Sequence, residues 1–161
     1  MDEILEMLEK DARLTAEEIA KATKKSPASV RAAVKKFERD GVILKYKTII
    51  NKELVKKNGS GARALIEVSV TPQKNVGFDK IAERIYMFPE VSSCYLMSGT
   101  YDLLVIVQGK DINEVASFVA EKLSPMEGVR STATHFLLKK YKEDGDILKQ
   151  KTKEKRLAIS I

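Results

Sequence analysis

The order of hydrophobic periodicities between residues 64 and 142 is the feature that most constrains the fold. Period-two, β-branched stretches predict strands at residues 64–71, 91–98, 101–108 and 129–141. Helical spacing of apolar residues predicts two amphipathic helices at residues 76–87 and 111–123. Gly99 and Thr100 predict a tight hairpin between the second and third strands.

This β-α-β-β-α-β order predicts a ferredoxin-like domain of the α+β class, with an antiparallel sheet. Its two crossovers should be right-handed, which places both helices on one face of the sheet. The domain has no further element to cover the other face. We therefore expect two chains to pair sheet against sheet.

Three helix starts precede this domain. Residues 4–12 have an apolar stripe at helical spacing. Thr15 and Glu18 have the spacing of a capping box, which predicts a second helix. Ser26 as N-cap with Pro27 at the first helical position predicts a third.

Residues 42–50, beyond the helix-stop signal Gly41, are rich in β-branched and aromatic side chains and predict one or two short strands. Three short helices, the last two joined by a short turn, and a strand pair together make a winged helix-turn-helix. We therefore expect this domain over residues 1–57, a linker over 58–63, the ferredoxin-like domain over 64–142 and a charged C-terminal tail over 143–161.

The positive charge of the chain is concentrated in one segment. The chain has a formal net charge of +6, whereas residues 21–57 alone contain twelve basic and three acidic side chains, a net +9. Residues 1–20 contain two basic and seven acidic side chains, a net −5. A localised basic stripe is typical of a nucleic-acid-binding surface, although a solvated helix face gives the same count.

The third helix would expose small residues near its start and cations near its end. Small residues allow close approach to the major groove, so that Ser29 and Arg31 would reach base edges while Lys35, Lys36 and Arg39 meet phosphates. A helical hairpin with a basic exposed face is the alternative. The full set of expected contacts to double-stranded DNA is Lys24, Lys25, Ser26, Ala28, Ser29, Arg31, Ala32, Lys35, Lys36, Arg39, Lys45 and Lys47.

Several functional classes receive no support from the sequence. Cys94 is the single cysteine and His135 the single histidine, which excludes an intramolecular disulfide and a structural zinc site. Walker, G-x-G-x-x-G, H-E-x-x-H and nucleophile-elbow motifs are absent, so we expect no enzyme, no metal and no cofactor. The acidic N-terminus and the lack of a long apolar run lead us to expect a cytoplasmic protein without a membrane partner.

Four sequence stretches, in this order, resemble one family. They are ILEMLEKDAR at 4–13, GVILKY at 41–46, SGTYDLL at 98–104, and GV at 128–129 followed by TAT at 132–134. The third looks like a G-x-[YF]-D turn. Together they resemble the Lrp/AsnC (feast/famine) family of prokaryotic transcriptional regulators, over nearly the whole chain from Met1 to Lys142.

This resemblance implies a homodimer or higher assembly that binds promoter DNA. It also implies a small effector, usually an amino acid, at a subunit interface of the C-terminal domain. Backbone N–H groups of the turn would receive a carboxylate, Asp102 would pair with an ammonium group, and threonine hydroxyls would orient the ligand. Alternatively, Gly99 only permits the turn and Asp102 caps it. The effector residues implied are Ser98, Gly99, Thr100, Tyr101, Asp102, Thr132 and Thr134.

Two positions depart from the family pattern. Lys24-Lys25 stands where the family commonly has Gly-Leu, and Ala33 where it often has arginine. Either departure would shift DNA binding toward phosphate contacts. Two other functions remain open: a sirohaem-decarboxylase-like enzyme of the same layout using His135, and a sensor or interaction protein that binds DNA weakly.

Overall fold

The structure is a computed structural model that describes residues 2–51, 54–55, 61–72 and 77–148. The chain divides into two compact units, Met1–Ile50 and Asn51–Ile161. Each unit has its own hydrophobic core of fully buried side chains.

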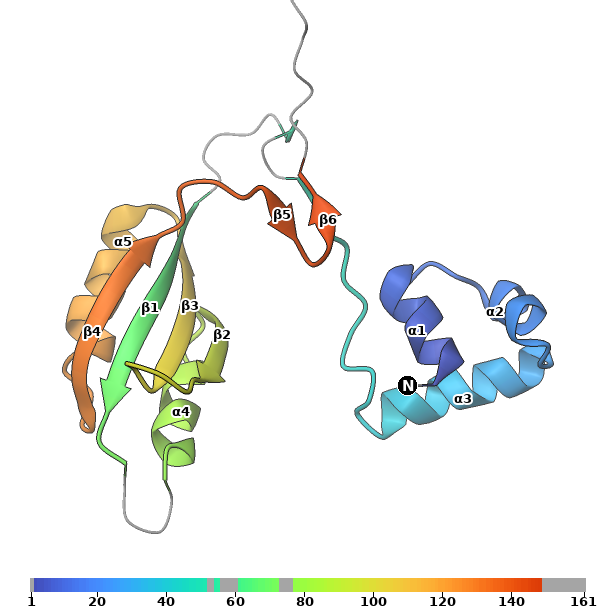
Figure 1. Cartoon of the computed structure of the whole chain (residues 1–161), viewed down its shortest axis with the longest axis horizontal. Coiled ribbons are helices and arrows are strands. Elements are labelled where there is room, and N and C mark those ends of the chain that lie inside the picture. The colour runs from blue at the N-terminus through green and yellow to red at the C-terminus, as the bar shows by residue number, and fades with distance from the viewer. Residues whose placement is uncertain (1, 52–53, 56–60, 73–76, 149–161) are drawn as a thin grey trace, which may run out of the picture. The chain divides into compact units, whose positions relative to one another are not determined.

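The N-terminal unit contains three helices, which are α1 (Glu3–Lys10), α2 (Ala16–Thr23) and α3 (Pro27–Arg39) (Figure 1). Each begins at a capping side chain that accepts a backbone hydrogen bond of its first turn. The predicted capping box is confirmed, because the Thr15 side chain accepts from Glu18 N–H and the Glu18 carboxylate accepts from Thr15 N–H. Apolar faces of all three helices meet in a core around Ile4, Ile19 and Val30.

The prediction of strands in residues 42–50 is wrong. Gly41 ends the helical path with φ +71°, and the N–H groups of Val42 and Ile43 donate to the Phe37 carbonyl oxygen at 2.8 and 3.0 Å. From there the chain is extended without strand pairing, although every residue of this segment is described. Strand-forming residues need a paired neighbour and a face to bury, and Leu44 remains 87% exposed.

The C-terminal unit has the predicted ferredoxin-like topology. Its elements are β1 (Ala62–Val70), α4 (Asp79–Tyr86), β2 (Val91–Leu96), β3 (Leu103–Gly109), α5 (Ile112–Phe118), which continues as a π-helical segment (Val119–Leu123), and β4 (Val129–Phe136). The strands form one antiparallel sheet in the order β2-β3-β1-β4 (Figure 1). The central position of β1 makes it the partner of both β3 and β4.

The two faces of this sheet differ. Alternate residues of β1, from Ala64 to Val70, are fully buried in a core shared with α4 and α5. The intervening residues face the other way, and directly paired residues share a face. We call this second side the open sheet face; it includes Leu65, Glu67, Leu104, Ile106, Ala133 and His135.

The connection between β2 and β3 is longer than the tight hairpin that we predicted. Leu96 pairs with Leu103, which leaves a loop of residues 97–102. Asp102 is the last residue of this loop. Its backbone N–H donates to the Val68 carbonyl at 3.1 Å, and its carboxylate accepts from Val70 N–H at 2.8 Å. These bonds attach it to β1, and its carbonyl oxygen accepts from Met97 N–H at 2.8 Å across the loop.

The last predicted strand and the predicted boundaries also need correction. Strand β4 ends at Phe136 rather than at residue 141. The last hydrogen bond between this segment and β1 runs from Leu137 N–H to the Arg63 carbonyl, and β1 itself begins only one residue before Arg63, so little of it remains to pair with. Residues 62 and 63, assigned to the linker, belong to β1. The region assigned to a tail begins with a hairpin of β5 (Lys142–Glu143) and β6 (Asp146–Ile147); residues 149–161 lie outside the described residues.

This short hairpin is tied to the sheet by charge. Asp144 and Gly145 both have positive φ, 48° and 91°, as a two-residue type I′ turn requires. Arg63 Nη1 lies 2.8 Å from the Glu143 carboxylate, which Lys140 also contacts. Lys140 first, and then Arg63, hold the pKa of Glu143 below its usual range.

Lys24 provides a test of the helix-turn-helix geometry, because it closes α2 in the left-handed region with φ 54°. A side chain costs about 1–2 kcal/mol there, whereas glycine loses about 0.5–1 kcal/mol more backbone entropy on folding. We expect Lys24→Gly to be more stable than Lys24→Ala by about 0.5–1 kcal/mol, measured by urea unfolding of the full chain with circular dichroism. Lys25 has no positive φ, so Lys25→Gly should not gain over Lys25→Ala. Equal stability of the two Lys24 variants contradicts the geometry.

Candidate DNA interface and effector site

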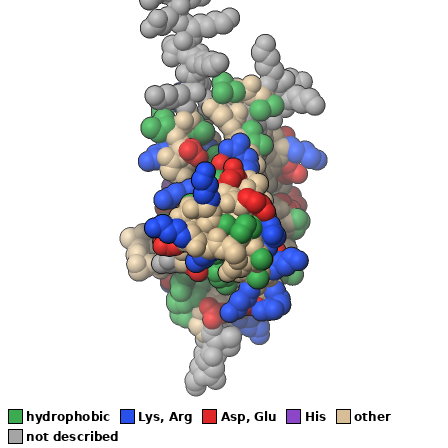
Figure 2. Space-filling model, turned by 90° about the vertical axis from the view of Figure 1, so that its right-hand side faces the viewer, with side chains coloured by type: hydrophobic (Ala, Val, Ile, Leu, Met, Phe, Trp, Pro, Cys, Tyr) green, Lys and Arg blue, Asp and Glu red, His purple; other side chains and the backbone are tan. Residues whose placement is uncertain are grey.

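The outer face of α3 combines small and basic side chains. Val30 is fully buried and Val34 and Phe37 pack against the core, so the opposite side of the helix faces solvent. Figure 2 shows Lys and Arg side chains spread over the surface that it displays, with carboxylates among them. The exposed residues on the outer side of α3 are Ala28, Ser29, Ala32, Lys35, Lys36 and Arg39.

Arg31 is exposed as well, but its guanidinium is held from α2. Its Nη1 donates to Glu17 Oε1 at 2.5 Å. A hydrogen bond from its own backbone N–H, followed by the one from Arg31, holds the pKa of Glu17 below its usual range. This cross-helix pair is not apparent in the sequence, because it depends on how α2 packs against α3.

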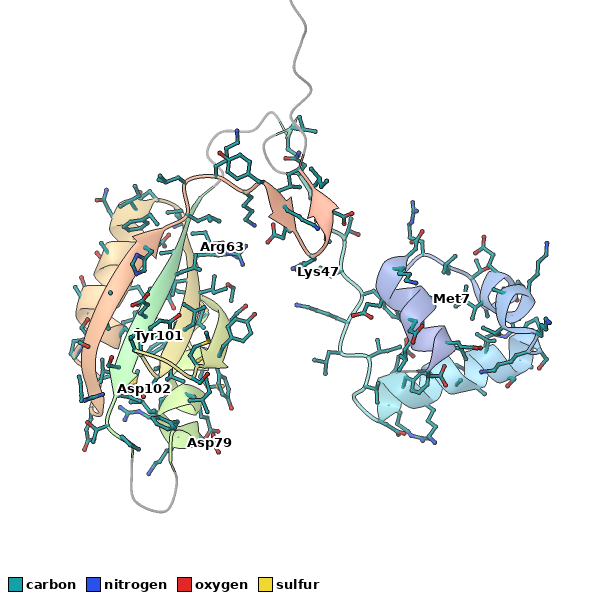
Figure 3. All side chains as sticks on the ribbon, viewed as in Figure 1. Met7, Lys47, Arg63, Asp79, Tyr101 and Asp102 are labelled. Atoms are coloured by element: carbon teal, nitrogen blue, oxygen red, sulfur yellow. The ribbon has the colours of Figure 1, made fainter. Side chains whose placement is uncertain are left out.

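The remaining predicted DNA contacts lie around this helix. Lys24 and Lys25 form the turn between α2 and α3, and both are exposed. The Ser26 hydroxyl accepts from Ser29 N–H at 3.2 Å, so its first role is to cap α3. Lys45 and Lys47 lie in the extended segment after α3 and therefore do not belong to a wing hairpin (Figure 3).

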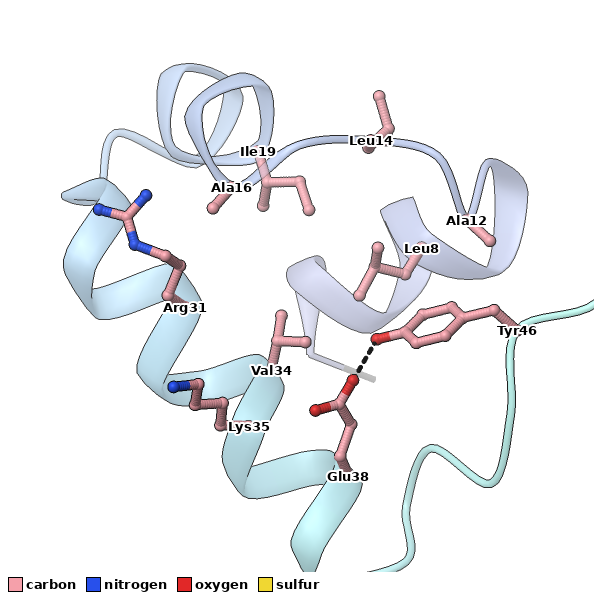
Figure 4. Close-up of a pocket in the computed structure, with 10 residues that line it drawn as sticks. All are labelled: Leu8, Ala12, Leu14, Ala16, Ile19, Arg31, Val34, Lys35, Glu38 and Tyr46. Carbon is pink, nitrogen blue, oxygen red and sulfur yellow. Dashed lines mark hydrogen bonds between the residues drawn. The ribbon is translucent and has the colours of Figure 1, made fainter.

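A cavity of about 280 Å³ opens beside α3, between the three helices and Tyr46 (Figure 4). Apolar side chains such as Leu8, Leu14 and Val34 line it, and Arg31 and Lys35 contribute from α3. The Tyr46 hydroxyl donates to Glu38 Oε1 at 2.9 Å. Desolvation, followed by this carboxylate, raises the pKa of Tyr46. The contact fixes the extended segment to the end of α3.

In the C-terminal unit, Asp102 is part of a network at one end of the sheet. Besides Val70 N–H, its Oδ2 faces Arg130 Nη2 at 3.6 Å. Arg130 lies at an irregularity of the β1–β4 register, where Ser69 pairs with Ser131 and Val70 with Val129. Such a bulge can redirect a side chain, and the local sequence pattern does not reveal it.

The other predicted effector residues lie partly together. Ser98, Gly99 and Thr100 are exposed and Tyr101 is half-buried in the same loop as Asp102 (Figure 3). In the described part of the chain, the backbone N–H groups of residues 98–101 have no hydrogen-bond partner.

The two threonines lie on β4 with their side chains on the helix-covered face, not on the open sheet face. Thr132 pairs with Val68, whose other partner is Leu103, so it lies at the same end of the sheet as the loop. Its Oγ1 is 3.1 Å from Ser124 Oγ. Thr134 pairs with Ile66, two residues further from the loop.

His135, the histidine considered for haem ligation, lies on the open sheet face with Nε2 3.3 Å from Glu67 Oε1. Within the described ranges, no cluster of three His, Cys, Asp or Glu side chains has the arrangement of a metal site. No helix among the described residues has both the length and the apolar character needed to cross a membrane.

Comparison with known proteins assigns both units to families. The Lrp/AsnC ligand binding domain matches residues 63–147. A winged helix-turn-helix DNA-binding family matches residues 3–43, which include α1, α2 and α3.

Relatives are similar over almost their whole length. YugG, an HTH-type transcriptional regulator of Bacillus subtilis, is 45% identical over 98% of this chain and 95% of its own. LrpA, an HTH-type transcriptional regulator of Pyrococcus horikoshii, is 32% identical over 86% of this chain and 94% of its own. A transcriptional regulator of Neisseria meningitidis, solved as its L-Met complex, is 29% identical with a TM-score of 0.68, covering 88% of this chain and 89% of its own. The chain thus belongs to the Lrp/AsnC family of transcriptional regulators, with a DNA-binding helix-turn-helix and a ligand-binding domain.

Proposed function

We propose that this regulator recognises specific duplex DNA sequences through the outer face of α3, as a homodimer that responds to an amino acid. The observation that carries the proposal is the distribution of side chains on that face. Ala28, Ser29 and Ala32 occupy its first half, and Lys35, Lys36 and Arg39 its second half. Small side chains let the start of a helix approach base edges while cations contact phosphates.

The loop of residues 97–102 supports an amino acid as the effector. Free backbone N–H groups in a Gly-containing turn suit a carboxylate, and the Asp102 carboxylate suits an ammonium group. Thr132 offers a hydroxyl at the same end of the sheet. The L-Met found with the Neisseria meningitidis regulator has this same chemistry.

The open sheet face supports a homodimer. Leu65, Leu104 and Ile106 form an apolar centre on it, and in the described part of the chain no helix covers them. A second copy covers an identical face by two-fold symmetry. Such a dimer presents two α3 helices to two half-sites of DNA.

The DNA interface is tested by removing two cations of α3. We expect the double variant Arg31→Ala/Lys35→Ala to bind promoter fragments at least about tenfold more weakly and with a shallower salt dependence, because fewer counterions are released. Gel retardation at several salt concentrations measures both effects. Lys80→Ala/Lys110→Ala removes the same charge from the C-terminal unit and should leave binding intact. Unchanged retardation by the α3 variant would remove this helix from the interface.

The effector site is tested by calorimetric titration of the common amino acids. We expect Asp102→Ala to bind the preferred amino acid at least about tenfold more weakly, since a charged partner and the support of the loop are both lost. Asp102→Asn keeps an acceptor for Val70 N–H and separates the two causes. Asp79→Asn, which removes an exposed carboxylate from α4, is the control. Equal affinities of all variants exclude Asp102 from the site.

The dimer is tested by placing a carboxylate on the open sheet face. We expect Ile106→Glu to raise the dimer dissociation constant about 100-fold or more, because pairing would bury unpaired charges. Sedimentation equilibrium measures the constant. Ile112→Glu places the same charge on α5, where Ile112 is already 57% exposed, and should leave the dimer unchanged. If both variants dimerise alike, another surface forms the contact.

A further inference from the structure

The ion pair between Glu17 and Arg31 links the first turn of α2 to the recognition helix. Arg31 Nη1 lies 2.5 Å from Glu17 Oε1, although both side chains are more than half exposed. Glu17 is the second residue of α2, where the helix dipole favours a carboxylate, and its pKa is lowered. The Glu17 carboxylate is therefore ionised at neutral pH and can hold the Arg31 guanidinium.

This restraint distinguishes Arg31 from the other cations of α3. In the described part of the chain, neither Lys35 nor Lys36 has an acidic partner, and Arg39 pairs only with its neighbour Asp40. Arg31 is held instead from a different helix, because its Nη1 donates to Glu17 of α2, and this bond fixes the direction of its side chain.

Arg31 also lies beside the part of α3 that can enter a groove most deeply. At 100° per residue, it is about 60° around the helix axis from Ala28 and about 40° from Lys35. The neighbouring side chains of Ala28 and Ala32 are methyl groups, so they leave space on the groove side of the helix. Its own side chain is 55% exposed and open to a ligand.

The chemistry of a held guanidinium favours a base over a phosphate. Guanidinium has five N–H donors in a rigid fork, of which Glu17 takes one on Nη1, and the donors on Nε and Nη2 have no partner among the described residues. A fork of this kind matches O6 and N7 of guanine in the major groove. The Glu17 carboxylate repels a phosphate that approaches the same group, and the restraint lowers the entropy lost on binding.

We propose that Glu17 is a positioning residue that holds Arg31 for a bidentate contact with guanine, so that this cross-helix pair sets part of the DNA specificity. The proposal rests on α3 being the recognition helix. It assigns to Glu17 a role through Arg31, without contact between Glu17 and DNA.

Base preference is the readout that separates this role from a structural one. A randomised duplex library is selected with wild type, Glu17→Gln, Arg31→Lys and Arg31→Ala, and the enriched sequences are compared. We expect wild type to require guanine at one position of each half-site. In Glu17→Gln and Arg31→Lys that preference should fall about tenfold, while affinity for random duplex DNA stays the same or rises.

Glu9→Gln is the matched control, because it removes an exposed carboxylate from α1 that makes no ion pair with Arg31. It should keep the full guanine preference. Thermal unfolding of each variant shows whether α2 and α3 remain packed, and a fall in preference without a fall in melting temperature supports positioning.

Three outcomes overturn the proposal. If Glu17→Gln keeps the wild-type preference for guanine, Glu17 has no part in recognition. Arg31→Ala that weakens binding to every sequence equally, with a shallower salt slope, makes Arg31 a phosphate contact. A wild-type chain that retards DNA but enriches no sequence excludes base reading altogether. Failure of the proposed interface is recognised separately, because the Arg31→Ala/Lys35→Ala variant would then retard DNA as well as wild type does.

Discussion

The burial of strand β1 is the constraint on which the C-terminal unit depends. Its alternate residues from Ala64 to Val70 are fully buried under α4 and α5, while its backbone pairs with β3 on one side and β4 on the other. Because side chains alternate along a strand, the same burial sends Leu65 and Glu67 to the open sheet face. The open sheet face, which the proposed dimer would cover, is thus a direct result of how this strand is packed.

The same strand also determines where the loop of residues 97–102 lies. The backbone of Val68 and Val70 bonds to Asp102, and the register irregularity beside Val70 directs Arg130 toward the same carboxylate. Residues from three separate stretches of sequence therefore meet at one end of the sheet. A contact between subunits at this end would change the surroundings of the loop directly.

Features that depend on neighbours in sequence could be predicted, and those that depend on distant partners could not. The capping box of Thr15 and Glu18 involves residues three apart, so it can be recognised in the sequence, and the helix begins as predicted. By contrast, the end of β4 is set by where β1 begins, and residues 42–50 form no strand because no neighbour pairs with them. Lys24 is an intermediate case. The sequence shows a lysine where the family commonly has glycine, but only the structure shows that this residue is left-handed.

Charge in the N-terminal unit limits how much binding can come from electrostatic attraction alone. Residues 1–50 contain eleven basic and nine acidic side chains, a net +2, because the combined net charge of −3 on α1 and α2 offsets the net +3 of α3. Non-specific affinity for DNA depends chiefly on the phosphates neutralised, so we expect a nearly balanced unit to bind random duplex weakly. Discrimination between sequences then depends on contacts whose direction is fixed. The carboxylate of Glu17 enters both considerations, since it lowers the net charge of the unit and pairs with Arg31 on α3, the helix proposed to read DNA.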